Sequence, residues 1–303
     1  MVKILTPAYG TALNYGSGIR VEAPLFAATV FTNEYRRMAL FHKTAEFLAM
    51  GIGFGKSIDG IVTHTMRCSK NFVPQEEVGS FNQAAVQIAK EARTQYGRKE
   101  GILIIGDMSV MGDCYSFKSV ADSVNQAVTY HLEQAKALVD AGVDVLLAET
   151  VGNVLEAKAF VQVADELNVP IYISFVLDPQ GNILDGTSIN EAIKTVDVHT
   201  VSPPIKYLTN CSWETQVEAM YSRAEETGLL HRLGGFYNNA SNITHDDKQE
   251  LGTVQRYDSI QEYIVWVRHM VDRFSCLREE DVWISGCCGF GADDIDQLVK
   301  ELG

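Results

Sequence analysis

Short apolar runs that alternate with longer amphipathic segments are the feature that most limits how this chain can fold. Most runs are rich in Val, Ile and Leu and end at a polar or glycine-containing break. Uninterrupted apolar runs of this length are typical of buried parallel strands. Eight of them occur, at residues 2–6, 60–65, 102–107, 143–149, 170–175, 206–211, 234–239 and 282–286.

Helices are predicted between these runs, because apolar residues there recur three and four positions apart. The clearest examples are residues 33–51, 81–97, 131–142, 153–167 and 259–274. A strand followed by a helix, repeated eight times, predicts an α/β fold, a single (β/α)8 barrel of the TIM type. A doubly wound open sheet is the alternative, because it is built from the same units and one miscounted strand would convert one fold into the other.

We expect one domain over residues 1–303. A chain of this length could also form two smaller domains. However, the sequence contains no low-complexity segment, no Pro- or Ser-rich linker and no abrupt change of charge that would mark a boundary.

The charge of the chain argues against several classes of partner. Its formal net charge is -14 and its sequence pI is about 4.9, a balance that repels phosphate backbones and anionic lipid surfaces. No stretch approaches the roughly 18 consecutive apolar residues of a transmembrane helix, and the first residues lack the pattern of a secretory signal. We therefore expect a cytoplasmic protein that binds neither nucleic acid nor membrane.

Polar residues gather where the predicted strands end. In a parallel barrel these ends meet at one rim, which is where barrel enzymes carry their chemistry. The residues there are Thr6, Thr63 to Thr65, Asp107, Glu149, Ser174, Cys211, Asn239, Cys287 and Cys288. No lysine lies at a predicted strand end, which disfavours chemistry based on a lysine amine.

Three of the six cysteines would meet at this rim. Cys211 follows the sixth predicted strand, and Cys287 and Cys288 follow the eighth. Three thiolates suit Zn2+ and leave one tetrahedral position open, as in catalytic rather than structural zinc sites. A thiol substrate could bind there as a nucleophilic thiolate, which favours displacement at a methyl carbon over hydrolysis or redox chemistry.

Spacing alone leaves two other interpretations of these cysteines open. The first is that they are small buried residues beneath a glycine-rich turn, which is a common state of cysteine. We expect that state for the remaining three, Cys68, Cys114 and Cys276. The second is that the glycine-rich segment 286–291 forms a phosphate cradle after the last strand.

The chain resembles the homocysteine S-methyltransferase family at these cysteines. That family carries an Asn-Cys pair late in the chain and a Gly-Gly-Cys-Cys-Gly motif near its end. The matching residues are Asn210-Cys211 in LTNCSWE and Gly286-Cys287-Cys288-Gly289 in WISGCCGFG. The segments GDMSVMGDCY, EQAKALVDAGVDVLLAETVGNVLEAKA and PIYISFVLDPQGNILDG also look like family segments in the right order. The resemblance thus covers nearly the whole chain.

The resemblance implies a zinc-dependent S-methyltransferase, with Zn2+ held by Cys211, Cys287 and Cys288. A methyl group would pass to the thiolate of homocysteine or a close analogue, giving methionine. S-methylmethionine or S-adenosylmethionine is the favoured donor, because the compact chain has no appended domain for cobalamin or folate, and betaine remains possible. The partners would be a small-molecule thiol acceptor and a methyl donor. The alternatives are a phosphate-binding barrel lyase or isomerase and a non-catalytic zinc-binding or redox-sensing thiol protein.

Two positions bear on the acceptor. Glu149 in LLAET matches the acidic residue that in this family meets the amino group of the amino-acid substrate. Thr6 stands where the family has an acid, although the following Gly10 and Thr11 match the family pattern. A neutral hydroxyl cannot replace a charged contact, so this departure puts homocysteine itself in doubt as the acceptor.

Other rim residues are weaker candidates. Ser174 and Asn239 could line the substrate pocket, but such residues also cap helices and stabilise turns. Ser285 replaces the first Gly of the family's Cys-Cys motif, and His64 stands where Asn is common. We expect His64 to be an ordinary hydrogen-bonded histidine near the rim.

Overall fold

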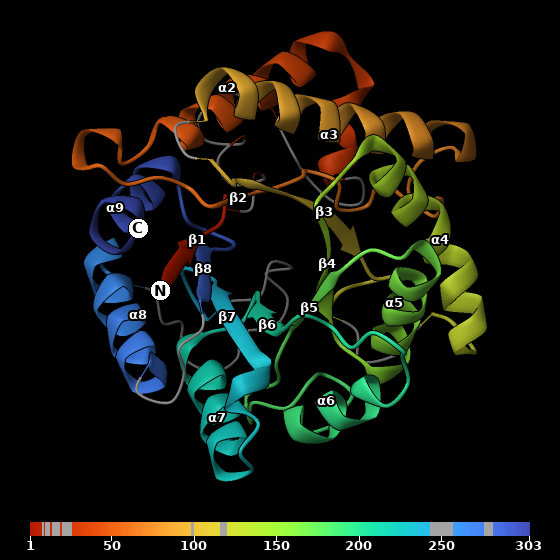
Figure 1. The fold of residues 1–303 in the computed structure, drawn as a ribbon, viewed down its shortest axis with the longest axis vertical. Coiled ribbons are helices and arrows are strands. Elements are labelled where there is room, and N and C mark those ends of the chain that lie inside the picture. The colour runs from red at the N-terminus through yellow and green to blue at the C-terminus, as the bar shows by residue number, and fades with distance from the viewer. Residues whose placement is uncertain are drawn as a thin grey trace.

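The protein is a parallel barrel in the computed structural model, which describes residues 1–7, 9, 13, 19, 26–97, 100–115, 120–242, 257–275 and 281–303. Eight strands form one parallel sheet in the order β1-β8-β7-β6-β5-β4-β3-β2. A parallel bridge between Leu5 and Gly60 joins the two ends of this order. Helices surround the strands (Figure 1). The predicted (β/α)8 barrel is therefore confirmed.

The strands lie where the apolar runs predict them, within three residues at either end. Their bounds are β1 Val2–Ile4, β2 Gly60–Val62, β3 Leu103–Ser109, β4 Val145–Val151, β5 Ile171–Phe175, β6 Tyr207–Asn210, β7 Leu233–Asn238 and β8 Val282–Gly286. The agreement follows from the sharp polar breaks that bound each apolar run.

The helices follow the predicted alternation. Their bounds are α2 Glu34–Ala49, α3 Gln75–Tyr96, α4 Val124–Ala141, α5 Val154–Leu167, α6 Ile189–Asp197, α7 Glu214–Glu226, α8 Ile260–Ser275 and α9 Ala292–Leu302, with short 3-10 helices η1 Phe26–Thr32, η2 Ile52–Phe54 and η3 Leu230–Arg232. Among the described residues, no helix has the length and apolar character needed to cross a membrane.

Two helices begin earlier than the apolar spacing predicts. Helix α3 starts at Gln75 rather than at 81, and α4 starts at Val124 rather than at 131. In both helices, residues at the helix N-terminus rather than the apolar spacing set the first residue. Acidic side chains occupy the first turn of α3, where their negative charge stabilises the positive end of the helix dipole. The Ser123 side chain accepts the Gln126 N–H and caps α4.

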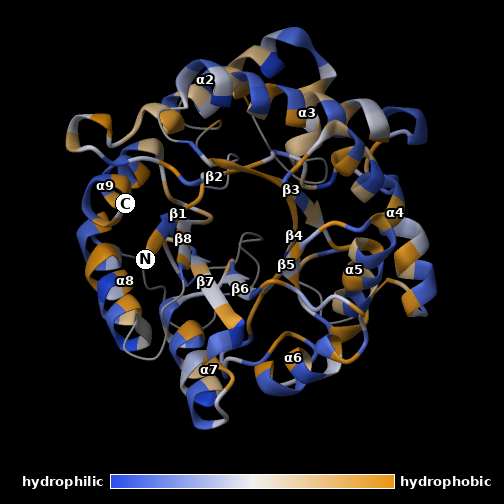
Figure 2. Cartoon of the chain, in the orientation of Figure 1, coloured by the Kyte–Doolittle hydropathy of each residue, from blue (hydrophilic) through white to orange (hydrophobic). Residues whose placement is uncertain are grey.

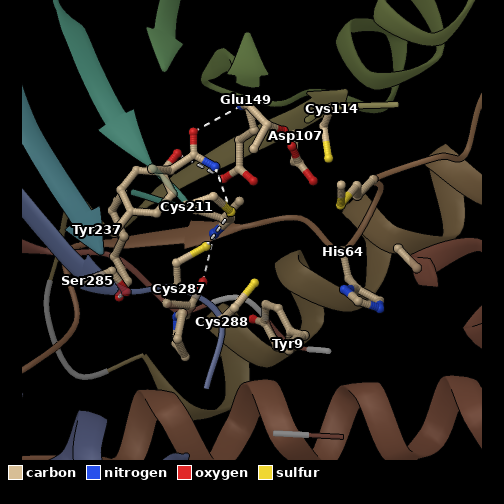
Figure 3. A pocket seen from close by; sticks show the side chains of 18 of the residues that line it. Tyr9, His64, Asp107, Cys114, Glu149, Cys211, Tyr237, Ser285, Cys287 and Cys288 are labelled. Carbon is tan, nitrogen blue, oxygen red and sulfur yellow. Dashed lines mark hydrogen bonds between the residues drawn. The ribbon is translucent and has the colours of Figure 1, made fainter. Parts of the chain in front are cut away.

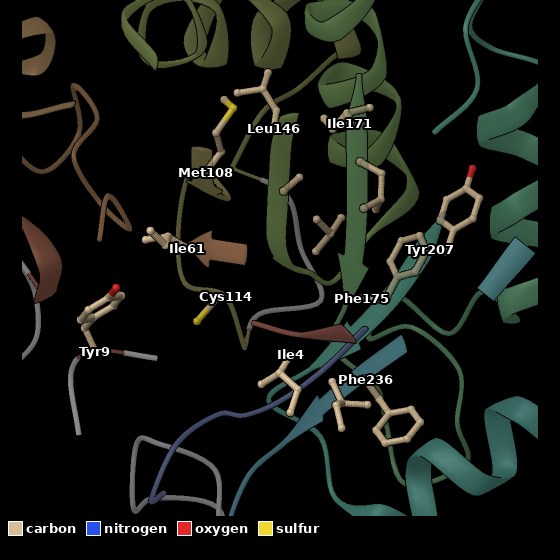
Figure 4. Close-up of a cluster of buried hydrophobic side chains, with 14 of the residues drawn as sticks. Ile4, Tyr9, Ile61, Met108, Cys114, Leu146, Ile171, Phe175, Tyr207 and Phe236 are labelled. Carbon is tan, nitrogen blue, oxygen red and sulfur yellow. The ribbon is translucent and has the colours of Figure 1, made fainter. Parts of the chain in front are cut away.

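Strand side chains divide between two apolar layers. One set fills the barrel and comprises Leu5, Val62, Ile105, Val145, Leu147, Tyr172, Leu208, Tyr237, Trp283 and Cys287. The other set, which includes Ile4, Met108, Phe175 and Phe236, packs in the larger cluster between the sheet and the helices (Figure 4). The helices carry hydrophilic residues mainly on their outer sides, whereas the strands are largely hydrophobic (Figure 2).

The interior layer determines which side chains reach the rim. Successive residues of a strand point to opposite faces. Because Ile105 and Leu147 point into the barrel, Asp107 and Glu149 also point inward, two residues closer to the C-terminal ends of β3 and β4. The alternation that buries the core thus also delivers polar side chains to the end where barrel chemistry is expected.

A buried polar pair ties the outer helices to the rim. His131 on α4 and Glu156 on α5 have exposed fractions of 0% and 1%, and their Nε2 and Oε2 atoms lie 2.7 Å apart. Glu156 also accepts the N–H of Met111, just after β3, at 3.3 Å. Since a buried carboxylate is costly without partners, this pair holds the segment after β3 in one position.

Gly235 allows β7 and β8 to approach each other closely. Its φ is +154°, and a Cβ atom built on it would lie 1.8 Å from the carbonyl oxygen of Trp283. The register of β7 against β6 shifts at the same place, where Tyr207 pairs with Leu233 and Leu208 pairs with Gly235. No larger residue fits here unless the backbone of β8 moves.

We predict that Gly235→Ala lowers the free energy of unfolding by about 3 kcal/mol, because the added methyl group forces strained backbone and overpacking. Urea unfolding followed by circular dichroism measures the change. Gly79→Ala in α3 is the matched control, because its added Cβ meets no atom within 4 Å other than the adjacent residues and backbone of its own helix, and it should stabilise the protein by about 0.5–1 kcal/mol. Equal unfolding midpoints for Gly235→Ala and wild type would contradict this account.

Candidate active site

A cavity of about 110 Å³ opens at the C-terminal rim of the barrel. Its described lining residues are Leu5, Thr6, Pro7, Tyr9, Ala27, Val62, Thr63, His64, Met66, Asp107, Cys114, Tyr115, Glu149, Thr150, Asn210, Cys211, Tyr237, Ser285, Cys287 and Cys288. Thiols, carboxylates and aromatic rings converge in it (Figure 3).

Three thiols meet on one side of the cavity. Cys211 directly follows β6, and Cys287 and Cys288 directly follow β8. Their Sγ atoms all lie within 4.8 Å of one another, and those of Cys211 and Cys287 are 3.0 Å apart (Figure 3). The structure thus brings together the three cysteines that the sequence predicts to be metal ligands.

The backbone around the thiols is held in uncommon conformations. Cys211 has a φ of +50° and Gly289 a φ of +90°, a region that residues other than glycine rarely adopt. The N–H of Cys287 donates to a backbone carbonyl at the end of β7 at 2.7 Å, and the N–H of Cys288 donates to Asn239 Oδ1 at 3.2 Å. These bonds fix the direction in which the adjacent cysteines enter the cavity.

Ionisation is unequal among the thiols. Hydrogen bonds from Cys211 and Cys288 hold the pKa of Cys287 well below its usual range, although burial acts in the opposite direction. The hydrogen bonds of Cys211 to Cys287 and Cys288 raise the pKa of Cys211 well above its usual range. The protein alone therefore favours one thiolate in this cluster, and a bound cation is needed to ionise all three.

This donor set fits zinc. Sulfur ligands on a tetrahedral zinc, with Zn–S bonds of about 2.3 Å, lie about 3.8 Å apart, which is compatible with three Sγ atoms that all lie within 4.8 Å of one another. Soft thiolates select zinc over hard cations such as magnesium. Within the described ranges, these cysteines are the one group of three or more His, Cys, Asp or Glu side chains close enough to share an ion. Three ligands leave a fourth position for a substrate atom.

Asn210, the last residue of β6, connects the thiols to neighbouring strands. Its Oδ1 accepts the Thr150 N–H at 3.0 Å and the Ser174 hydroxyl at 2.7 Å. Its Nδ2 donates to Cys211 Sγ at 3.4 Å. Thr150 has a φ of +54° and lies where β4 shifts register against β5, an irregularity common beside active sites. One buried amide thus couples the shape of β4 to the position of a thiol.

Two carboxylates face the cavity from β3 and β4. Burial raises the pKa of Glu149, with further contributions from Asp107 and Cys287, while the Tyr237 hydroxyl donates to Glu149 Oε1 at 3.0 Å and opposes the rise. Burial also raises the pKa of Asp107 to about 8, and a hydrogen bond from the Met66 backbone opposes it. The described lining residues include no Lys or Arg, so no cationic side chain in the described part of the lining balances these acids.

The remaining predicted substrate residues occupy different places. Thr6 lines the cavity, and its Oγ1 accepts the Val62 N–H at 2.9 Å. Ser174 and Asn239 are outside the set of described lining residues. Their polar groups are used instead in the bonds to Asn210 and to the backbone of Cys288. Direct contact of either residue with a substrate stays a prediction.

His64 lines the cavity but differs from its predicted state. Within the described part of the chain its Nε2 has no hydrogen-bond partner, so the prediction of an ordinary hydrogen-bonded histidine is wrong at this atom. The ring packs beside Tyr9, with centroids 5.5 Å apart. Burial lowers the pKa of His64 to about 3, and the ring therefore stays neutral at physiological pH.

Sequence reasoning missed some of the lining. Cys68 and Cys114 are buried, as predicted, but Cys114 also lines the cavity. Asp107 stood at a predicted strand end, and alternation from the inward Ile105 could have identified it. No local sequence pattern marks Tyr237 as a lining residue, because its role depends on a hydrogen bond to Glu149 on another strand. Three residues considered in the sequence, Gly10, Thr11 and Cys276, lie outside the described residues.

Comparisons with known proteins find relatives along most of the chain. A sequence model described as homocysteine S-methyltransferase matches residues 8–302. Homocysteine S-methyltransferase 2 of Arabidopsis thaliana is 27% identical over 251 residues, which is 75% of this chain and 72% of that protein. Selenocysteine methyltransferase of Astragalus bisulcatus is 28% identical over 142 residues, 38% of this chain and 42% of that one. The metallated form of homocysteine methyltransferase MmuM from Escherichia coli has a TM-score of 0.73 at 18% identity, covering 99% of this chain and 95% of the other.

We predict that Asn210→Ala weakens zinc binding by about 10- to 100-fold, because Cys211 and β4 lose a shared hydrogen-bond partner. Competition with a chromophoric zinc chelator measures the affinity. Ser174→Ala is the control, since it removes one bond to the amide and leaves those to Thr150 and Cys211, and its effect should be smaller. Equal zinc affinity for Asn210→Ala and wild type would show that the thiols are positioned without this amide.

Proposed function

Because the chain belongs to the homocysteine S-methyltransferase family, we propose that it transfers a methyl group from a cationic donor to the thiolate of homocysteine or a close analogue. The protein is a methyltransferase, and methionine is the product when homocysteine is the acceptor. One observation carries the proposal: the three thiols that suit a metal ion share a cavity with two buried carboxylates.

Zinc is the metal we propose, held by Cys211, Cys287 and Cys288. The spread of their sulfur atoms and their soft donor character support it. Bound zinc would keep the acceptor sulfur ionised at neutral pH while leaving it nucleophilic. The relative from Escherichia coli was solved in a metallated form, which is consistent with a metal in a barrel of this kind.

The surroundings of the thiols favour the displacement itself. The acceptor sulfur forms a bond to the methyl carbon while that carbon loses its bond to the donor's sulfonium or ammonium atom, which keeps the electron pair and leaves neutral. An anion and a cation are thereby consumed and two neutral groups appear. Burial around Leu5 and Cys287, which are 2% and 3% exposed, keeps water away, and loss of hydration favours a reaction that cancels charge.

Glu149 is the residue we propose for the ammonium group of the acceptor. Its carboxylate points into the cavity from β4, and the Tyr237 hydroxyl fixes its orientation. Thr6 offers no charge from β1, and its Oγ1 already accepts a backbone N–H. Ser174 and Asn239 would act behind the cavity, by positioning Asn210 and the backbone of Cys288.

The acidic lining of the cavity supports a cationic methyl donor. Two acids and no Lys or Arg occur among the described lining residues, and a bound cation favours the ionised form of an acid whose pKa is raised by burial. Sulfonium donors such as S-methylmethionine or S-adenosylmethionine, and betaine, are therefore suited to it. A phosphate would find no cationic partner among these residues, which counts against the lyase or isomerase alternative. Membership of an enzyme family counts against a non-catalytic thiol sensor.

We predict that protein purified under reducing conditions without added metal contains about one zinc per chain, and that Cys288→Ala loses most of it, because two thiolates bind zinc far more weakly than three. Elemental analysis by mass spectrometry gives the stoichiometry. Cys114→Ala is the matched control, since Cys114 lines the same cavity outside the three-thiol group, and its zinc content should match wild type. Folded, reduced wild type without zinc would contradict the metal assignment.

We further predict methionine formation when the zinc-loaded protein is given homocysteine and S-methylmethionine. Mass spectrometry with a labelled methyl group follows the transfer, and S-adenosylmethionine and betaine are tested in parallel. Removal of zinc with a chelator should reduce the rate to that without enzyme, and added zinc should restore it. Transfer that persists after complete removal of metal would contradict the proposed role of the thiols.

A further inference from the structure

Asp107 is a buried acid that the proposed mechanism leaves unused. It lies near the end of β3, is 4% exposed, and lines the same cavity as the three thiols. Acids are seldom buried without a partner, because the charged form loses its hydration. A carboxyl group in this position needs either a compensating group from the protein or one from a ligand.

Geometry places Asp107 and Glu149 on the same wall of the cavity. In the register of β3 against β4, Asp107 pairs with Leu147 and Ser109 pairs with Glu149. Each acid lies two residues after an inward-pointing residue, Ile105 or Leu147, on the same strand and therefore also points inward. Both carboxyl groups point into the cavity (Figure 3). They are close enough for the charge of Asp107 to raise the pKa of Glu149.

The protein satisfies Asp107 only in part. The Met66 backbone donates one hydrogen bond to its carboxyl group. Its Oδ1 is buried and has no hydrogen-bond partner among the described residues. An unpaired buried acceptor is unfavourable because it has lost its hydrogen bonds to water, so a donor from a bound molecule would stabilise it.

No cationic side chain in the described lining can supply that donor. Lys and Arg are absent from it, and His64 is neutral because burial lowers its pKa to about 3. A metal ion shared by Asp107 and Glu149 is also disfavoured. Hard cations need six or more oxygen ligands or ordered waters, and in the described ranges the three cysteines alone form a group of metal-ligand type. An organic cation is the ligand that fits.

We propose that Asp107, together with Glu149, binds a cationic group of the substrate, and so supplies from β3 the charge that Thr6 does not supply from β1. The inference rests on the proposed function. The ligand chemistry is an ammonium or sulfonium cation attached to an amino-acid-like substrate. The ammonium group of the acceptor is the first source, because Glu149 beside Asp107 is the proposed contact for that group. The donor's cation is the second source.

The test is calorimetric titration of zinc-loaded wild type and Asp107→Asn with three probes. L-homocysteine carries the ammonium group, 4-mercaptobutanoate has the same thiol and carboxylate without it, and S-methylmethionine carries the donor's cation. Asp107→Asn should weaken homocysteine binding by about tenfold or more, because a charge-assisted bond becomes a neutral one. It should leave 4-mercaptobutanoate binding and zinc content unchanged. Asp140→Asn, on the exposed face of α4, is the control and should change none of these.

A second variant separates charge from structure. The double variant Thr6→Asp with Asp107→Asn returns a carboxylate to the cavity from β1, and it should recover part of the lost homocysteine affinity. A purely structural role for Asp107 predicts no recovery. If Asp107→Asn does not fold or loses zinc, Asp107→Ser, which also removes the charge, takes its place, and selective weakening of homocysteine over 4-mercaptobutanoate is again expected.

The outcomes distinguish this inference from the proposed function. Selective loss of S-methylmethionine binding in Asp107→Asn would support the inference with the donor as the source of the cation. Unchanged binding of both cationic probes, or equal weakening of homocysteine and 4-mercaptobutanoate, would overturn it while leaving thiol methylation intact. Failure of zinc-loaded wild type to bind either thiol would overturn the proposed function, and this inference with it.

Discussion

Backbone pairing around the parallel sheet is the constraint on which the rest of this structure depends. β1 pairs with β8 from Val2 to Ile4, and the Leu5–Gly60 bridge links it to β2. The first strand is therefore the seam of the barrel, and the two chain ends lie near each other beside it (Figure 1). Within the sheet β7 alone separates β6 from β8, and the parallel pairing of these three strands brings Cys211 to Cys287.

Regular structure and strained structure are separated along the barrel axis. The interior below the rim is filled by apolar side chains in ordinary strand geometry. At the rim, Thr150 and Cys211 adopt positive φ, and buried acids and thiols crowd together. Departures of this kind are expected where function rather than folding selects the residues. The apolar layers provide the stability that such a rim lacks, and Asn210 connects its strained positions to one another.

The sequence predicts the architecture well because its signals are local. Apolar runs with polar breaks identify the strands, and acidic residues in the first turn of α3 and the Ser123 cap of α4 explain why these two helices begin before their apolar spacing does. Only part of the candidate site can be predicted from the sequence. The cysteines and Glu149 follow from strand ends meeting at one rim. The contact of Tyr237 with Glu149 and the bonds of Asn210 do not, because they depend on register shifts in β4 and β7, which depend on contacts between strands rather than on any local pattern. His64 shows the same limit, since only packing reveals that its Nε2 is left unbonded.

The close approach of Cys211 and Cys287 makes this pair of thiols sensitive to oxidation when no metal is bound. Their sulfur atoms are 3.0 Å apart, which is longer than a disulfide bond of about 2.05 Å but needs little movement to become one. The neighbouring thiols also favour the thiolate of Cys287, and the thiolate is the form that oxidants attack. A metal ion and an oxidant would therefore compete for the same sulfur atoms. A disulfide between Cys211 and Cys287 would use two of the three thiols, so the proposed metal site would be complete only in the reduced protein.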